Sequence, residues 1–232
     1  QQLIPGQPVD HYSGNMEGKE QRFGIVNSAI WATATTAASN GSVNSMHDSY
    51  SPLGGMFPMI MMQLGEVVFG GVGSGLYGML AFVILTVFIA GLMVGRTPEY
   101  LSKKIGKSEM QWVMIALLTP CAAILLGSGI ATIWPSALES IANAGPHGLS
   151  ELLYAFSSAS GNNGSAFAGL NANTPFFNIG LGIIMLITRL AILIPSLALA
   201  GLLIKKPTVA LTSGTFSTDS GLFAILLISI IL

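Results

Sequence analysis

Two short stretches of small and amide residues could bind a cation, although the rest of the chain is strongly apolar. The first, TTAASNGSVNSMHD, runs from Thr35 to Asp48, and the second, SSASGNNGSAFAGL, runs from Ser157 to Leu170. Backbone carbonyls without helical partners can coordinate a cation when small side chains let it approach, and glycine allows successive carbonyls to turn toward one axis. A single Ser-Asn-Gly would more simply be a turn between helices. Two such stretches favour cation-coordinating loops.

The two stretches are related by a constant offset. Placing Gly41 on Gly164 (164 − 41 = 123) aligns SNGS with NNGS, and the same offset brings Pro52 onto Pro175, where each following apolar run begins. A repeat of this length is typical of a duplicated unit of short helix, polar loop and long span. The candidate cation-coordinating residues are Ser39, Asn40, Gly41, Ser42, Asn162, Asn163, Gly164 and Ser165.

Composition places the chain in a membrane. It is 51% hydrophobic and 8% charged, whereas soluble domains carry roughly a quarter charged residues. A net charge of −1 with nine Lys and Arg residues offers no basic face, so no nucleic-acid partner is expected. The one cysteine, Cys121, cannot form a disulfide framework or a thiolate metal site by itself, and we expect a buried thiol.

Three apolar segments are candidate spans: Leu53–Gly95, Gln111–Trp134 and Pro175–Ile204. The first would be about 65 Å long as a straight helix, roughly twice the hydrocarbon thickness. The glycine-rich run GGVGSGLYG should interrupt it, which makes it either a hairpin of two short spans or a single broken pass. Parallel repeats favour the single pass. Its expected flexible loop contains Gly70, Gly71, Gly73 and Gly75, and helix packing is the alternative role for these glycines.

The segments before the polar loops are too short to cross a membrane. Phe23–Ala38 and Glu151–Ser158 fit re-entrant half-helices whose C-terminal ends present negative dipole to a bound cation. A half-helix, a glycine-centred loop and an outer span together form the unit of a potassium-type selectivity filter. We therefore expect an all-α membrane protein built from potassium-channel-like helix–pore loop–helix repeats.

Glu66 and Arg189 are the only charged residues in their apolar runs, and the repeat offset relates them. Charges within a bilayer are costly, which makes each a functional candidate. We expect them to face the cavity beneath the filter, to pair directly or through water, and to form part of a gate or electrostatic barrier. A buried structural ion pair is the alternative.

Several strings resemble one family closely. They include GNMEGKEQRFG, TTAASNGSVNSMHDS, GEVVFGGVGSGLYGML, FIAGLMVGRTPEYL, GPHGLSELLYAFSSASGNNGSAFAGL and KKPTVALTSGT. The chain resembles, from about Gly14 onward, the C-terminal half of the potassium-binding, channel-like subunit of Kdp-type potassium-transporting ATPases. In that family four filter-bearing repeats surround one pore, and Asn40 departs from the cysteine of other members. The resemblance implies high-affinity potassium uptake across the bacterial inner membrane by a multi-pass subunit without a catalytic site of its own.

The resemblance also implies partners and an order of segments. The partners are a P-type ATPase catalytic subunit, small accessory subunits and the lipid bilayer, and K⁺ is the transported ion, held by backbone carbonyls, with no other cofactor. The expected segments are an extracytoplasmic loop (1–22), the third-repeat pore helix, filter and broken span (23–95), a cytoplasmic loop (96–110), the fourth repeat (111–204), a cytoplasmic loop (205–220) and the start of a truncated last transmembrane helix (221–232).

Other functions fit the sequence less well. Ser39, His47 and Asp48 are the residue types of a hydrolase triad, but a G-x-S-x-G turn is missing, and neighbouring His and Asp do not by themselves form the required hydrogen bonds. We expect His47, Asp48 and His147 to be mouth or loop residues, and Asp48 could help to draw cations toward the entrance. The chain has no nucleotide-binding glycine motif. A gradient-driven Trk or Ktr-like channel and a non-transporting membrane scaffold remain the alternatives.

Overall fold

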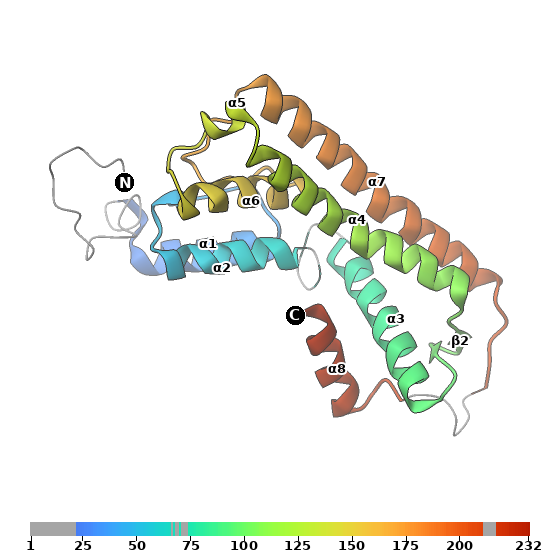
Figure 1. Ribbon diagram of the computed structural model, residues 1–232. Coiled ribbons are helices and arrows are strands. Elements are labelled where there is room, and N and C mark those ends of the chain that lie inside the picture. Colours follow the sequence, from blue (N-terminus) through green and yellow to red (C-terminus); the bar gives the residue numbers. More distant parts are fainter. Residues whose placement is uncertain (1–21, 66, 68–69, 71–73, 211–216) are drawn as a thin grey trace, which may run out of the picture.

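The computed structural model describes residues 22–65, 67, 70, 74–210 and 217–232, and this part of the chain is mostly helical (Figure 1). The α-helices are α1 (Ile25–Ala37), α2 (Pro52–Leu64), α3 (Ser74–Val94), α4 (Lys107–Ala131), α5 (Pro135–Leu138), α6 (Pro146–Ser160), α7 (Pro175–Lys205) and α8 (Gly221–Ile231). A short 3-10 turn, η2, covers His47–Ser49, and the strands β1 (Glu99–Tyr100) and β2 (Lys103–Lys104) pair antiparallel.

Three of the described helices, α3, α4 and α7, are long and apolar enough to cross a membrane. Helices α1 and α2 have 13 residues each and α6 has 15, which is short of the roughly 20 that a span needs. The protein is therefore an all-α membrane protein, as the sequence predicts, with one very small hairpin added. The long helices α3, α4 and α7 are thus accompanied by shorter helices that can enter the bilayer without crossing it.

The largest core cluster lies where α4, α6 and α7 meet. In Figure 1, α4 and α7 run side by side, α1, α2 and α6 gather near one end of that pair, and α3 and α8 lie toward the other end. The cluster includes Ala131, Leu152, Ala155, Phe156, Phe177 and Ile184. A second cluster joins α3 to α4 through Ile84 and Val113, and a third joins α3 to α8 through Val87 and Phe223.

The first apolar segment is broken between α2 and α3. Helix α2 ends at Leu64, where Gly65 has a φ of 59°, and Gly70 also has a positive φ, of 68°. Helix α3 then continues onward in a new direction and does not fold back along α2 (Figure 1). That the segment makes a single broken pass and not a hairpin stays a prediction, because residues 66, 68–69 and 71–73 lie outside the described part of the chain. The break ends earlier than expected, because Gly75 lies in the first turn of α3.

The fourth-repeat half-helix is longer than its apolar pattern indicated. Helix α6 covers Pro146–Ser160, whereas Glu151–Ser158 was the sequence-based expectation. Gly145 turns the chain with a φ of 78°, and Pro146 occupies the first helical position, where its fixed φ suits a helix. The half-helix before the third loop, α1, differs from its predicted bounds by only one or two residues.

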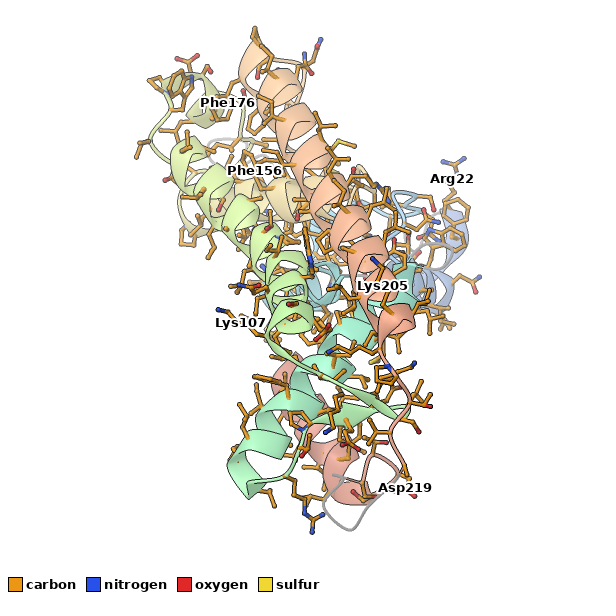
Figure 2. All side chains as sticks on the ribbon, turned by 90° about the vertical axis from the view of Figure 1, so that its right-hand side faces the viewer. Arg22, Lys107, Phe156, Phe176, Lys205 and Asp219 are labelled. Atoms are coloured by element: carbon orange, nitrogen blue, oxygen red, sulfur yellow. The ribbon has the colours of Figure 1, made fainter. Side chains whose placement is uncertain are left out.

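The lysine-rich ends of α4 and α7 lie close together. Helix α4 begins at Lys107, before the predicted Gln111, because the Glu109 carboxylate accepts a hydrogen bond from the Gly106 amide at 2.8 Å and caps the helix. In Figure 2, Lys107 and Lys205 lie toward one end of the α4–α7 pair, and Phe156 and Phe176 lie toward the other. Positive charge is typical of the cytoplasmic side of a membrane protein, and the cytoplasmic position of this end stays a prediction.

Cys121 is not the buried thiol that its apolar neighbours suggested. It lies on α4 and is exposed. An apolar run indicates burial in a soluble protein, but a membrane span can direct apolar side chains toward lipid as well as toward protein. Hydropathy therefore could not assign Cys121 to the core.

Candidate cation-binding filter

Helices α1 and α6 end in the same way, at the two polar loops. The residue two positions beyond each helix, Ser39 or Asn162, has a positive φ, of 52° or 57°. The next backbone amide, of Asn40 or Asn163, then donates to the carbonyl five residues earlier, at 2.8 or 3.2 Å. Left-handed conformations are costly for residues with a side chain. Their occurrence at equivalent positions identifies these turns as a repeated feature.

The repetition continues through each loop. Asn40 Oδ1 accepts a hydrogen bond from the Ser42 amide, and Asn163 Oδ1 accepts one from the Ser165 amide, both at 2.8 Å. These are Asx turns, in which a side chain replaces a backbone carbonyl. In the fourth repeat Gly164, which lies between Asn163 and Ser165, has a φ of 76°. The side chains thus bind part of each loop's backbone while other carbonyls stay outside helical pairing.

The helices that follow the loops also begin alike. Helix α2 follows Ser51, whose hydroxyl accepts from the Gly54 amide at 3.3 Å, and α7 follows Thr174, whose hydroxyl accepts from the Phe177 amide at 3.5 Å. In both, proline is the first helical residue, where no backbone N–H is needed. The two repeats therefore share a half-helix, a loop and the start of an outer helix.

The third and fourth loops lie against each other. Asn163 Nδ2 donates to Ser39 Oγ at 3.0 Å. The contact at Gly41 is closer still, since a Cβ added there would lie 2.3 Å from the Asn163 carbonyl oxygen. The C-terminal ends of α1 and α6 therefore bring their loops to one place, and the negative end of each helix dipole accompanies them.

A buried aromatic residue supports the fourth loop. The Tyr154 hydroxyl lies 3.0 Å from Ser165 Oγ, and the Tyr154 ring stacks on Phe167 with 4.4 Å between ring centroids. Burial raises the pKa of the Tyr154 phenol to about 12. The hydroxyl therefore stays protonated near neutral pH, and its contact with the loop does not depend on pH there.

A cavity of about 160 Å³ lies beneath the end of α6 and beside the α2–α3 break. Residues that line it include Gly65, Val67, Ser74, Ser157, Ser160 and Gly161. Arg189 is exposed on α7. Its neighbour Thr188 is fully buried and accepts a hydrogen bond from Asn162 Nδ2 at 3.2 Å. Glu66, Gly71 and Gly73 lie outside the described residues, so their predicted roles as gate and flexible loop stay predictions.

A polar network joins the two repeats outside the candidate filter residues, and sequence reasoning missed it. Asp48 Oδ1 lies 2.7 Å from His147 Nε2, and Asn143 Nδ2 donates to Asp48 Oδ2 at 3.1 Å and to Glu151 Oε1 at 2.7 Å. Asp48 and Glu151 are buried. Asp48 is thus not the cation-attracting mouth residue that we expected, because its carboxylate is withdrawn from solvent and occupied by the fourth repeat.

The polar side chains of the same network already have hydrogen-bond partners within the protein. Ligand atoms of Asp48, His147 and Glu151 lie within 4.8 Å of one another, but amide groups and His147 already occupy their carboxylate oxygens. The Ser39 hydroxyl is bound by Asn163 in the other loop. Ser39 and Asp48, two of the three residues considered for a hydrolase triad, therefore bind different partners, Asn163 and His147.

Comparison with known proteins identifies related sequences. The model of a family described as the potassium-transporting ATPase A subunit matches residues 2–232. A potassium-transporting ATPase potassium-binding subunit of Clostridium perfringens is 62% identical over 97% of this chain and 39% of its own length. Similarly named proteins of Herpetosiphon aurantiacus and Desulfovibrio desulfuricans are each 62% identical over 94% of this chain and 38% of their length. The chain thus spans about two fifths of these curated relatives.

Proposed function

Because the chain belongs to the family of potassium-transporting ATPase A subunits, we propose that it supplies two of the filter loops through which such a subunit binds and translocates potassium. The loops at Ser39–Ser42 and Asn162–Ser165 are the third and fourth filters. The ATP that drives uptake is hydrolysed by a separate P-type subunit, and this chain is a non-catalytic part of the complex.

One observation carries this proposal: the two loops have the same hydrogen bonds at equivalent positions and lie side by side at the ends of two short helices. Ordinary turns between helices have no reason to share a positive φ, an Asx turn and a capped proline start. Loops that surround one axis do, because each must present its carbonyl oxygens to the same ion.

The chemistry is replacement of a hydration shell. A potassium ion that enters from the extracytoplasmic side loses water, and backbone carbonyl oxygens of the filter loops take the water's place. The negative ends of α1 and α6 favour the cation electrostatically. Two loops provide only half of a ring, so binding requires the other repeats of the full-length subunit.

The proposed function also implies a location and partner subunits. We place the protein in the bacterial inner membrane as a multi-pass subunit, beside the P-type ATPase subunit and small accessory subunits. The three spanning helices support a multi-pass arrangement, and the names of the relatives support assembly with an ATPase. K⁺ is the transported ion.

The hypothesis that Glu66 and Arg189 form part of a gate or electrostatic barrier beneath the filter stays a proposal, and of the two only Arg189 lies among the described residues. The repeat offset that relates the two residues supports this assignment; Arg189 itself is exposed on α7. Replacing Arg189 with Gln in the full-length subunit should change ion retention or the coupling of transport to ATP hydrolysis. Unchanged transport by a stably assembled R189Q complex would remove Arg189 from the gate.

The central test is potassium uptake from micromolar medium, in cells without other uptake systems, by the full-length parent that carries Gly164→Asp. We expect loss of high-affinity uptake with the complex still assembled, because the side chain is forced onto a positive-φ backbone and adds charge beside the ion. Asn171→Asp adds the same charge at an exposed residue after the filter and should transport normally. Normal potassium affinity and selectivity of the G164D variant would mean that the fourth loop is only a turn between helices.

A further inference from the structure

We propose that the Asn163 side chain does not bind the ion and instead sets the spacing between the third and fourth filter loops, which makes it a determinant of ion selectivity. The inference rests on the proposed function, because it concerns the same two loops. It assigns a positioning role to a side chain at the point where the loops approach most closely.

The oxygen of the Asn163 side chain is fully occupied. Oδ1 accepts from the Ser165 amide at 2.8 Å and from the Ser158 hydroxyl at 2.6 Å. A backbone N–H can only donate, so this contact also fixes which end of the amide is the oxygen. Since an amide oxygen has two lone pairs, none remains for a potassium ion.

The nitrogen is occupied as well, and it reaches into the other repeat. Nδ2 donates to Ser39 Oγ in the third loop at 3.0 Å and to Met62 Sδ on α2 at 2.9 Å. Both N–H groups are thereby used. Ser39 is 8% exposed and Met62 is 2% exposed, so the amide bridges two repeats in a largely buried setting.

The hydrogen bonds of the Asn163 side chain form a joint that holds the third and fourth loops at one separation. It ties α6 and the fourth loop, through Asn163 Oδ1, to the third loop and α2, through Nδ2. Close beside it, Gly41 lies against the Asn163 carbonyl oxygen. Filter carbonyls can replace a hydration shell only while their separation is maintained. Both lone pairs of Asn163 Oδ1 and both N–H groups of Nδ2 take part in this joint. The side chain therefore controls that separation without touching the ion.

The equivalent residue of the third repeat is used differently. Asn40 makes the same Asx turn, but its side chain is exposed. Thr35, the counterpart of Ser158, donates its hydroxyl to the backbone carbonyls of Asn40 and Ser42 and not to the Asn40 side chain. Within the described residues the inter-repeat joint therefore belongs to Asn163, and the two asparagines are not interchangeable.

The test is a double-mutant cycle in the full-length complex, with Asn163→Ala, Ser39→Ala and the two combined. The readout is the half-saturating concentration of K⁺ and of Rb⁺ for uptake, together with assembly. We expect N163A to reduce the preference for K⁺ over Rb⁺ by about tenfold, the scale of a lost buried hydrogen bond. S39A should act in the same direction and less strongly, and the double variant should match N163A, because the two residues share one contact.

Asn171→Ala is the matched control, because Asn171 makes an Asx turn with Asn173 but is exposed and outside the filter. It should leave the K⁺ to Rb⁺ preference unchanged. The proposal would be overturned if the effects of N163A and S39A on the K⁺ to Rb⁺ preference multiplied in the double variant. A normal K⁺ to Rb⁺ preference in N163A would also overturn it. If the N163A complex fails to assemble, the S39A variant provides the test. An unchanged K⁺ to Rb⁺ preference in S39A then overturns the proposal.

The G164D result separates the two levels of inference. If G164D abolishes uptake while N163A transports with normal selectivity, the filter assignment stands and the positioning role fails. If both variants behave as wild type, the filter assignment itself fails.

Discussion

The carboxylate of Glu109 lies 2.6 Å from the ammonium of Lys206 and so joins the first turn of α4 to the end of α7. Glu109 is 2% exposed, and the same ammonium donates to the Lys104 carbonyl at 2.8 Å. The pair therefore fastens both ends of the fourth repeat to the β1–β2 hairpin at the predicted cytoplasmic side.

Replacing Lys206 with Met should destabilise the protein by about 2–3 kcal/mol, because it leaves a buried carboxylate without its cation. Thermal unfolding of the purified full-length complex measures the change. Lys205→Met is the matched control, since Lys205 is exposed, and its midpoint should stay close to wild type. Equal midpoints for K206M and K205M would mean that the pair contributes little.

The α4–α6–α7 core should not tolerate a methyl group at Gly127. A Cβ there would lie 2.5 Å from Phe156 Cδ1 and 2.6 Å from Ile184 Cδ1, and overpacking of this kind costs about 1–3 kcal/mol. Gly127→Ala should lower the unfolding midpoint of the complex. Gly129→Ala, two residues along the same helix with open space at its Cβ, should be neutral or slightly stabilising. The reverse order would contradict the packing seen here.

The polar network beneath the α5–α6 loop should depend on the charge of Glu151. This fully buried carboxylate accepts hydrogen bonds from the Ala142 and Asn143 amides at 3.0 and 3.1 Å. Glu151→Gln turns an acceptor into a donor that faces other donors, and should cost about 1–3 kcal/mol of stability. Chemical unfolding of the complex would measure this, with exposed Glu139→Gln as control. A stability loss no larger than that of E139Q would argue against the network.

Close approach of the filter loops predicts that Gly41→Ala abolishes high-affinity potassium uptake. The added Cβ would lie 2.3 Å from the Asn163 carbonyl oxygen, so the loops would have to separate. Gly182→Ala on α7, where a Cβ meets nothing within 4 Å, should transport normally. Uptake assays at micromolar potassium, with membrane levels of both variants measured, test the difference. Wild-type affinity in G41A would show that the two loops are not held this closely during transport.

The spans and the repeat could be predicted because their signals are local. Hydropathy over a window of about 20 residues identifies a helix that can cross the bilayer, and α3, α4 and α7 are such helices. The repeat was visible as SNGS and NNGS at a fixed offset, and the structure places the same turn at both positions.

Other features could not be predicted, because they depend on which segments meet. The burial of Asp48 follows from its contact with His147, 99 residues away. Exposure of Cys121 follows from the face of α4 that carries it, and hydropathy does not distinguish lipid from protein interior. The start of α6 at Pro146 was missed because this helix is amphipathic and partly polar, so an apolar window underestimates it.

The sequence by itself determined that this is an all-α membrane protein with two related polar loops, since composition and periodicity act within single segments. Only the tertiary structure decided that the loops touch, and that the Asn163 amide donates a hydrogen bond to Ser39 of the other repeat. Two residues with equivalent local sequence, Asn40 and Asn163, make the same turn but have different neighbours. Contacts between residues 124 positions apart arise from packing of helices, which the local pattern of either loop does not encode.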